Sequence, residues 1–179
     1  MKNKFISFFL ILFVNNCSQD VNDFDLVKKE GVWIKNGKEY SGDVYHILNG
    51  QKIKSGQIEK GKKIGKWIEY GQIIFRSGEY FQGKRKGKWE GWYSDSSKAY
   101  LGYYDEDVKI GLWKGWNKDG KLSYAGNYIQ GKKNNTWKYW YDNGNLSDSG
   151  DYKDDKMIGL WKYYSPDGVF KEEKDYGNK

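Results

Sequence analysis

Short runs of alternating apolar and polar residues fill most of the chain, and large aromatic residues return within them at a fixed interval. Trp89, Trp113, Trp137 and Trp161 are each 24 residues apart. A period of this size indicates one supersecondary unit written several times rather than a set of independent motifs. Aligned on these tryptophans, the chain divides into six units, which open at residues 42, 65, 87, 111, 135 and 159.

Each unit has the same internal order. It opens with Gly-x-Trp or a variant, carries a large side chain three positions later, turns, and returns through a small residue, a Gly and, two positions on, usually a Tyr. The turns include Asn49-Gly50, Asp119-Gly120, Asn143-Gly144 and Asp167-Gly168. These pairs favour β-hairpins, because Asn, Asp and Gly adopt positive φ at low cost.

This pattern predicts an all-β fold: an elongated, twisted antiparallel meander of about six 24-residue β-hairpin repeats. We assign residues 31–179 to it. In the returning strand, Leu122, Tyr124, Gly126 and Tyr128 share one face, and Leu146, Gly150 and Tyr152 repeat this arrangement. A glycine within a strand weakens it unless a large side chain uses the space. We therefore expect the Trp of a neighbouring strand to lie over each such Gly.

The composition supports strands and argues against catalysis. Aromatic residues make up 18%, with 23 Gly and one Pro. A single His and a single Cys leave no material for a His/Cys metal site, a disulfide framework or a Ser/His/Asp triad. His46 is more typical of a surface or packing residue, and the acidic turns lack the ligand spacing of a calcium loop. We predict a protein that is not an enzyme and uses no cofactor or metal.

The N-terminus has the pattern of an export signal. Lys2 and Lys4 precede a ten-residue apolar run, 5–14. As a helix this run rises about 15 Å, which is too short to cross a bilayer, so residues 1–16 predict a secretory signal peptide. Residues 17–30 are mainly polar and acidic, and we expect a tether there. The alternative is a short first strand around Phe24 and Leu26.

The only cysteine follows the apolar run directly, in the order Val-Asn-Asn-Cys17. This resembles the lipobox of bacterial lipoproteins, which implies diacylation of Cys17 and anchoring to the outer or cytoplasmic membrane of a bacterial cell envelope. Two buried acyl chains give stable anchoring. The alternative is plain secretion with an incidental Cys. Removal of residues 1–16 takes away two lysines and leaves a net charge of 29 − 24 = +5.

The turns that precede each Trp are basic, and a meander places them all at one edge of the sheet. We predict a basic rim, whose candidate binding residues are Lys62, Lys63, Lys84, Arg85, Lys86, Lys109, Lys132, Lys133 and Lys156. Such a rim suits anionic lipid, surface polysaccharide or an acidic partner. The alternative is that these lysines only solvate the array and prevent edge association. A basic, aromatic sheet would also suit nucleic acid, but export argues against this partner.

A second candidate binding set consists of the aromatic residues three positions after each Trp. Strand alternation points them away from the Trp face, and they are Trp92, Trp116, Trp140 and Tyr164. We expect the repeated Trp to hold the sheet together and this second set to be the one offered to a partner.

Units of the form Gly-x-Trp-x-x-Tyr, turn, Ser-Gly-x-Tyr, Gly-Lys-x-x-Gly resemble the MORN-repeat variant of bacterial proteins over about residues 32–176. The resemblance implies a scaffold, and some such chains are described as antitoxins of toxin–antitoxin pairs. Choline- and glucan-binding cell-wall repeats are similar in their Gly-Trp and Tyr-Tyr pairs but have shorter periods. We therefore expect a monomeric, non-catalytic protein-interaction scaffold; the alternatives are a binder of cell-wall glycan or anionic lipid and an antitoxin-like inhibitor.

Overall fold

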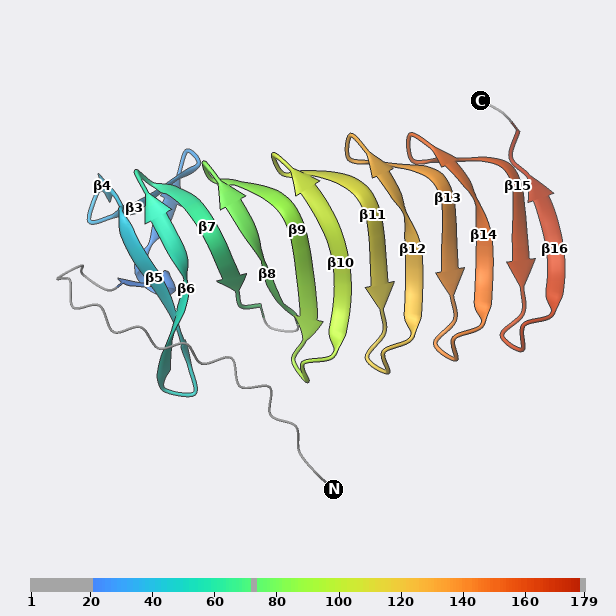
Figure 1. The fold of residues 1–179 in the computed structure, drawn as a ribbon, viewed down its shortest axis with the longest axis horizontal. Coiled ribbons are helices and arrows are strands. Elements are labelled where there is room, and N and C mark those ends of the chain that lie inside the picture. Colours follow the sequence, from blue (N-terminus) through green and yellow to red (C-terminus); the bar gives the residue numbers. More distant parts are fainter. Residues whose placement is uncertain (1–20, 72–73, 178–179) are drawn as a thin grey trace, which may run out of the picture.

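The structure, a computed structural model, describes residues 21–71 and 74–177 and is nearly all β (Figure 1). One sheet has 13 strands in the order β1-β5-β6 and onward in sequence to β16, and a second has three strands. The strands of the large sheet are β1 (Val21–Asn22), β5 (Gly42–Leu48), β6 (Gln51–Glu59), β7 (Lys62–Glu69), β8 (Ile74–Phe81), β9 (Lys84–Tyr93), β10 (Lys98–Asp105), β11 (Val108–Trp116), β12 (Leu122–Ile129), β13 (Lys132–Trp140), β14 (Leu146–Lys153), β15 (Lys156–Tyr164) and β16 (Phe170–Asp175). The small sheet consists of β2 (Val27–Lys29), β3 (Val32–Lys35) and β4 (Lys38–Glu39).

The large sheet is the predicted meander. From β5 to β16 each strand pairs antiparallel with the next strand in the sequence, and the sheet does not close. Figure 1 shows the curved strands side by side, with the turns at two opposite edges. The predicted all-β repeat of 24-residue hairpins is confirmed, and it leaves two faces and two turn edges for function.

The glycine in the middle of each returning strand from β6 to β14 lies under the Trp of the following strand, as predicted. A Cβ added at Gly56, Gly78, Gly102, Gly126 or Gly150 would stand 2.1–2.3 Å from the nearest indole atom of Trp67, Trp89, Trp113, Trp137 or Trp161. These five tryptophans are at most 3% exposed. The absent side chain is the space that the indole ring occupies, so glycine and tryptophan form one packing unit.

A continuous series of aromatic rings covers the same face. The five tryptophans alternate with Tyr80, Tyr104, Tyr128, Tyr152 and Tyr176, with ring centroids 5.1–6.4 Å apart and planes at 75–90°. Edge-to-face packing of this kind is favourable because the positive ring edge meets the negative ring face. We call this side of the sheet the ladder face and the other side the second face.

A residue with positive φ recurs two positions before each ladder Trp, and a β-bulge accompanies it before Trp89, Trp113, Trp137 and Trp161. Gly65, Gly87, Gly111 and Gly159 have φ of 61–69°, and Asn135 replaces the glycine with φ 60°. Asn tolerates this left-handed conformation better than most residues, which explains how the unit can lose its Gly. Each indole N–H donates to the carbonyl directly after the covered glycine, as in Trp137 Nε1 to Asn127 O at 3.2 Å.

The N-terminal part of the described chain is folded, in contrast to the expected tether. Val21 is fully buried and pairs with Val44 in a short parallel contact between β1 and β5. A 3-10 turn, Asp23–Asp25, then leads to Leu26, which is 8% exposed in the same core. Val21 and Leu26 therefore belong to the core around Val44 and Trp67, whereas Phe24 and Val27 of the same segment are exposed. The alternative strand is also wrong for Phe24 and Leu26, which lie in and just after this turn.

The small sheet lies against the first hairpins of the meander. Trp33 N–H donates to Gly61 O and Gly61 N–H to Tyr40 O, both at 2.8 Å. The predicted signal peptide and Cys17 lie outside the described residues. Within the part that is described, no helix has the length and apolar character needed to cross a membrane.

Candidate functional site

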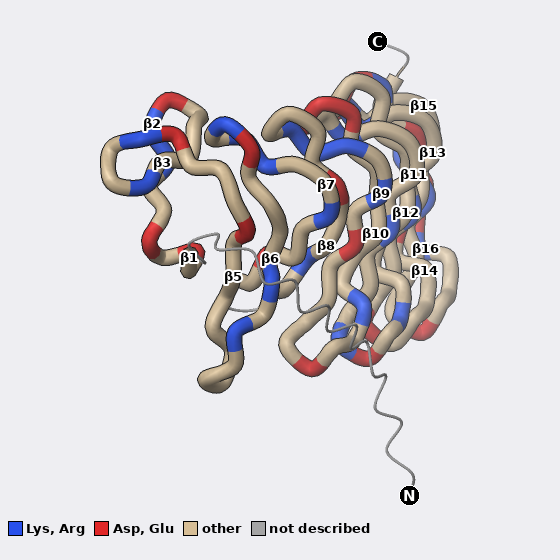
Figure 2. Tube along the Cα trace, turned by 60° about the vertical axis from the view of Figure 1, so that its left-hand side comes forward, with Lys and Arg blue, Asp and Glu red and all other residues tan. Residues whose placement is uncertain are grey.

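The turns predicted to be basic do lie at one edge of the large sheet. They are two-residue hairpin turns in which both residues have positive φ, for example Lys60-Gly61 and Gln130-Gly131. Neighbouring turns are bonded laterally, as in Gly131 N–H to Lys109 O at 2.9 Å. Figure 2 shows acidic residues beside the basic ones along this edge.

The structure divides the predicted rim residues into two groups. Lys62, Lys84, Lys86, Lys132 and Lys156 are exposed, and we call them the outer rim. Lys63, Arg85, Lys109 and Lys133 are half-buried, because strand alternation turns the second residue of each strand toward the ladder face. The expected single basic rim is thus replaced by an exposed row and an inward row.

The inward row covers the aromatic ladder with positive charge. The Nζ atoms of Lys63, Lys109 and Lys133 lie 4.1, 4.4 and 4.6 Å from the ring centroids of Trp67, Trp113 and Trp137. Burial lowers the pKa of each of these three lysines. Their stems shield the indole rings and their ammonium groups make cation–π contacts, so these residues contribute to packing.

The outer rim is partly neutralised. Lys84 Nζ lies 2.8 Å from Glu106 Oε2, and Arg85 Nε of the inward row lies 2.7 Å from Asp107 Oδ1. Exposed pairs of this kind contribute little stability, but they reduce the charge offered to an anionic partner. Lys62, Lys86, Lys132 and Lys156 form no ion pair within residues 21–71 and 74–177.

The aromatic residues three positions after each Trp are half-buried, and they follow the second face. Trp92 stacks on Phe75 with centroids 5.2 Å apart. Trp116 lies 5.4 Å from Lys98 Nζ, which in turn is bonded to Glu90 at 2.8 Å. We call Trp92, Trp116, Trp140 and Tyr164, with their cross-strand partners Phe75, Lys98, Leu122, Leu146 and Phe170, the second-face row. The expectation that Leu122 and Leu146 lie on the ladder face is wrong, because a register shift at the start of each strand pairs them with Trp116 and Trp140.

Further apolar side chains are exposed on the second face. Tyr103, Leu112 and Leu160 each precede a residue of the ladder in their strands, so they point to the opposite side. They are 39%, 41% and 57% exposed. The second face therefore combines a half-buried aromatic row with exposed apolar side chains, whereas the ladder tryptophans are fully covered.

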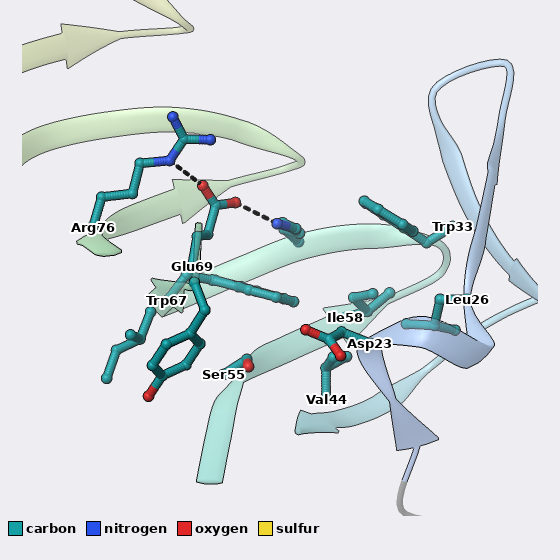
Figure 3. Close-up of a pocket in the computed structure, with 12 residues that line it drawn as sticks. Asp23, Leu26, Trp33, Val44, Ser55, Ile58, Trp67, Glu69 and Arg76 are labelled. Carbon is teal, nitrogen blue, oxygen red and sulfur yellow. Dashed lines mark hydrogen bonds and ion pairs between the residues drawn. The ribbon is translucent and has the colours of Figure 1, made fainter. Parts of the chain in front are cut away.

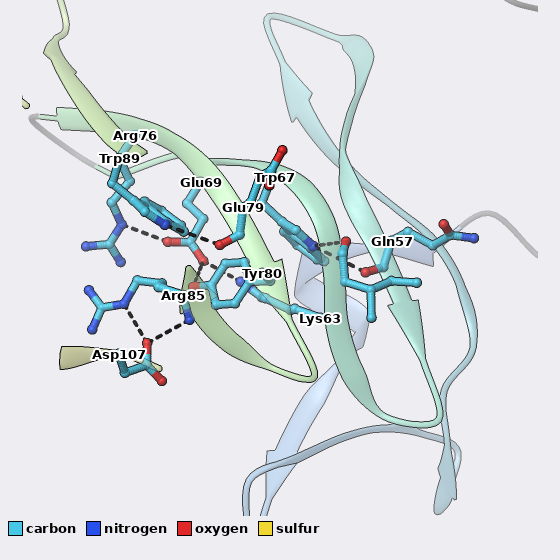
Figure 4. A network of polar contacts seen from close by, with 11 residues as sticks. Gln57, Lys63, Trp67, Glu69, Arg76, Glu79, Tyr80, Arg85, Trp89 and Asp107 are labelled. Atoms are coloured by element: carbon cyan, nitrogen blue, oxygen red, sulfur yellow. Dashed lines mark hydrogen bonds and ion pairs between the residues drawn. The ribbon is translucent and has the colours of Figure 1, made fainter. Parts of the chain in front are cut away.

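The second unit carries a charged cluster that the sequence reasoning missed (Figure 4). The carboxylate of Glu69 accepts hydrogen bonds from Lys63 Nζ, from Arg76 Nε at 2.7 Å and from the Tyr80 hydroxyl at 2.8 Å. Glu69 and Lys63 side chains are only 16% and 14% exposed. The sequence did contain a signal for this cluster, namely a departure from the repeat. Glu69 pairs with Arg76 at a position where the next two units pair a glycine with a tyrosine, Gly91 with Tyr100 and Gly115 with Tyr124.

Burial and charge compete in this cluster. Burial alone would raise the pKa of Glu69, but the Lys63 ammonium and the hydrogen bonds from Lys63, Tyr80 and Arg76 outweigh it and lower that pKa. Burial lowers the pKa of Lys63 by more than the attraction of Glu69 raises it, and the nearby charges of Arg76 and Lys28 lower it further. Glu69 is thus a firmly ionised carboxylate within an excess of positive charge.

A hollow of about 260 Å³ lies next to this cluster, under the N-terminal turn (Figure 3). Asp23, Ser55, Trp33 and Trp67 are among the residues that line it. His46 Nδ1 lies 2.8 Å from Asp23 Oδ2, so its acid comes from a distant part of the sequence. Within the described residues, no group of three or more His, Cys, Asp and Glu side chains is placed to hold a metal ion.

Comparison with known proteins assigns no family to this chain. No protein-family model matches the chain. No curated protein matches it either. The resemblance to MORN-type repeats therefore stays a prediction, and functional reasoning depends on the geometry of the two faces, the outer rim and the cluster around Glu69.

Proposed function

We propose that this protein is a lipid-anchored scaffold of a bacterial cell envelope that binds a partner protein through the second face of its sheet. The observation that carries the proposal is the division of labour between the aromatic residues. The ladder tryptophans are buried against glycines and are not accessible to a partner. In contrast, Trp92, Trp116, Trp140 and Tyr164 repeat once per hairpin along the other face.

A regular surface of this kind suits an extended partner, because each hairpin presents an equivalent contact at a fixed spacing. Aromatic residues beside exposed apolar side chains are also typical of the energetic centre of protein interfaces. The terminal strand β16 supports a monomer, since its exposed sequence Phe-Lys-Glu-Glu-Lys-Asp places charge along the free edge.

The experiment is capture from envelope fractions with the mature chain as bait. We compare the wild-type protein with Trp116→Lys/Trp140→Lys on the second face and with Lys62→Gln/Lys132→Gln on the outer rim. The proposal expects one or more proteins to be retained by the wild type and the rim variant and lost with the second-face variant. Circular dichroism and thermal unfolding show whether each variant is folded. Equal retention by all three would contradict the proposal.

The second candidate function is binding of an anionic surface through the outer rim. It is favoured by the four unpaired lysines, each of which contributes roughly 1 kcal/mol near an anionic leaflet. Vesicles with and without phosphatidylglycerol test it: binding that falls with salt and is lost in Lys62→Gln/Lys132→Gln supports it, and binding that is insensitive to salt contradicts it. Glycan binding by the ladder tryptophans loses its support, because it requires exposed rings and these are buried.

A further inference from the structure

A basic cleft lies between the small sheet and the ladder face of β7–β9, with about 460 Å³ of open space. Its lining is unusual in charge: five cations face two carboxylates, which gives a net charge of 5 − 2 = +3. The cations are Lys28, Lys62, Lys63, Arg76 and Arg85, and the carboxylates are Glu69 and Asp107. We refer to these residues as the basic cleft.

The two arginines are held in place by their inner nitrogen atoms. Arg76 donates through Nε to Glu69 and Arg85 through Nε to Asp107, both at 2.7 Å. The Nη atoms of both side chains make no hydrogen bond within the described residues, and Figure 4 shows them pointing to the same side of the cluster. A positioned guanidinium with free Nη groups is a strong binder of carboxylate or phosphate, because its donors match the spacing of two anion oxygens.

The positive charges of the basic cleft also act on one another. The charges of Arg76 and Lys28, in addition to burial, lower the pKa of Lys63. The Nζ atoms of Lys28 and Lys63 lie 5.9 and 5.5 Å from the same ring, that of Trp33. Like charges gathered at one place destabilise one another, and a bound anion would relieve this repulsion.

The cleft continues into the hollow under the N-terminal turn, since Trp33, Lys63, Glu69 and Arg76 line both. Ser55 is 5% exposed in this hollow, and neither its Oγ nor Asp23 Oδ1 has a hydrogen-bond partner among the described residues. Figure 3 shows the Asp23 carboxylate directed toward the interior of the group. Unpaired buried polar atoms are uncommon and need an explanation. A ligand with hydroxyl groups supplies one.

We propose that the basic cleft binds a sugar that carries a compact oxyanion, either a phosphate or a carboxylate. The oxyanion lies on the Nη groups of Arg76 and Arg85, the sugar ring lies toward Trp33, and its hydroxyls extend toward Ser55 and Asp23. A flat lipid surface fits less well, because the side chains of Lys63 and Glu69 are only 14% and 16% exposed, so a projecting group reaches them more readily than a flat surface does. This proposal is independent of the scaffold function.

Titration calorimetry of the full processed chain in nonionic detergent tests the proposal. The probes are glucose 6-phosphate, glucuronate, glucose and inorganic phosphate. We expect at least one of the two anionic sugars to bind, and glucose to bind about tenfold more weakly or not at all, since hydrogen bonds to charged groups are the strong ones. Equal binding of glucose and the anionic sugars overturns the proposal. Binding of inorganic phosphate as tight as that of the sugars shows an adventitious ion site only and overturns it as well.

Variants then locate the site. Arg76→Gln/Arg85→Gln should lose about tenfold or more in affinity, whereas Lys138→Gln/Lys162→Gln, which removes the same charge from the second face, should change it by less than about twofold. Asp107→Asn should tighten binding, because it removes a carboxylate that competes for Arg85. This variant also keeps the test valid if the double arginine variant does not fold. Equal losses in the two double variants, or weaker binding by Asp107→Asn, overturn the proposal.

Vesicles containing phosphatidylglycerol form the last arm of the experiment. Binding to vesicles through Arg76 and Arg85, with no binding of either free sugar, would assign the basic cleft to lipid headgroups and overturn the sugar proposal. Retention of partner proteins by the arginine variant is measured in parallel. The scaffold proposal expects this variant to retain the partner proteins, because they bind the second face alone. Loss of sugar binding and loss of partner retention therefore test the two proposals independently.

Discussion

Trp137 lies flat over Gly126, so that a Cβ at Gly126 would stand 2.1 Å from Cδ2 of the indole. The ring replaces the side chain that Gly126 lacks, and its N–H satisfies the carbonyl of Asn127, the next residue. The relationship is repeated in every unit from Gly56 and Trp67 to Gly150 and Trp161. It makes the ladder face a structural element and leaves binding to the other surfaces.

The contact between these two residues can be measured by a double-mutant cycle. Gly126→Ala should lower the free energy of unfolding by about 1–3 kcal/mol through overpacking, and Trp137→Ala by about 3–5 kcal/mol through the cavity it leaves. In the Trp137→Ala background the cost of Gly126→Ala should shrink by roughly 1 kcal/mol or more, because the clash is gone. Additive losses in urea unfolding would show that the two residues do not pack as described.

Asn135 should be a site where stability is gained. Its φ of 60° lies at a position where Gly65, Gly87, Gly111 and Gly159 occupy the other units. Asn135→Gly should raise the free energy of unfolding by a few tenths to about 1 kcal/mol, and Asn135→Ala should lower it, because alanine pays the full cost of a left-handed conformation. Thermal unfolding measures both. Gly111→Asn, at the equivalent position of the fourth unit, is the reverse control and should be destabilising.

Because of the Glu69 cluster, we expect the free energy of unfolding to fall steeply at acid pH. The pKa of Glu69 is lowered from its usual value of 4.5 in the folded protein. The contribution of Glu69 to the free energy of unfolding is therefore fully present above about pH 4.5. It is lost as the pH falls through the lowered pKa of the folded state, because the unfolded state then binds more protons than the folded state does. In Glu69→Gln the free energy of unfolding should depend less on pH below about pH 4.5. Urea unfolding at several pH values measures this dependence, and the same dependence in Glu69→Gln as in the wild type would contradict this role. Glu173→Gln, on the exposed edge strand, is the control.

The predicted anchor lies at Cys17, outside the described residues, and has its own test. Cys17→Ser should abolish diacylation, so the protein should move from the detergent phase to the aqueous phase in phase separation and lose the mass of the lipid. A Ser18→Ala variant should stay in the detergent phase. Continued partition of Cys17→Ser into detergent would show that this residue is not the anchor.

The sequence was sufficient for the repeat, because the ladder depends on short-range patterns that are written six times. Trp137, Gly126 and the turn at Asn143-Gly144 could be assigned from spacing alone. The inward direction of Lys63 and Lys133 was missed, although each shares the strand parity of the Trp four positions later, because all the basic residues near these turns were assigned to one rim. The folded N-terminal segment was also missed, because Val21 is an isolated apolar residue in a polar stretch and its partner Val44 is distant in sequence.

The cluster at Glu69 was overlooked for a different reason. Alignment of the units emphasises what they share, and Glu69 with Arg76 is a departure from the Gly–Tyr pair seen in two later units. Departures from a repeat mark places where one unit does something that the others do not. The basic cleft lies at this departure, beside the small sheet that covers only the first hairpins.

The most direct test of the account compares two tryptophans three positions apart in β13. We expect Trp137→Ala to lower the free energy of unfolding by about 3–5 kcal/mol, because a fully buried ring is removed from its glycine, and Trp140→Ala to lower it by no more than about 1–2 kcal/mol, because that ring is half-buried on the second face. Urea unfolding of the two variants gives the result in one measurement. Equal losses, or a larger loss for Trp140→Ala, would contradict the claim that the ladder Trp holds the sheet and leaves its neighbour to bind.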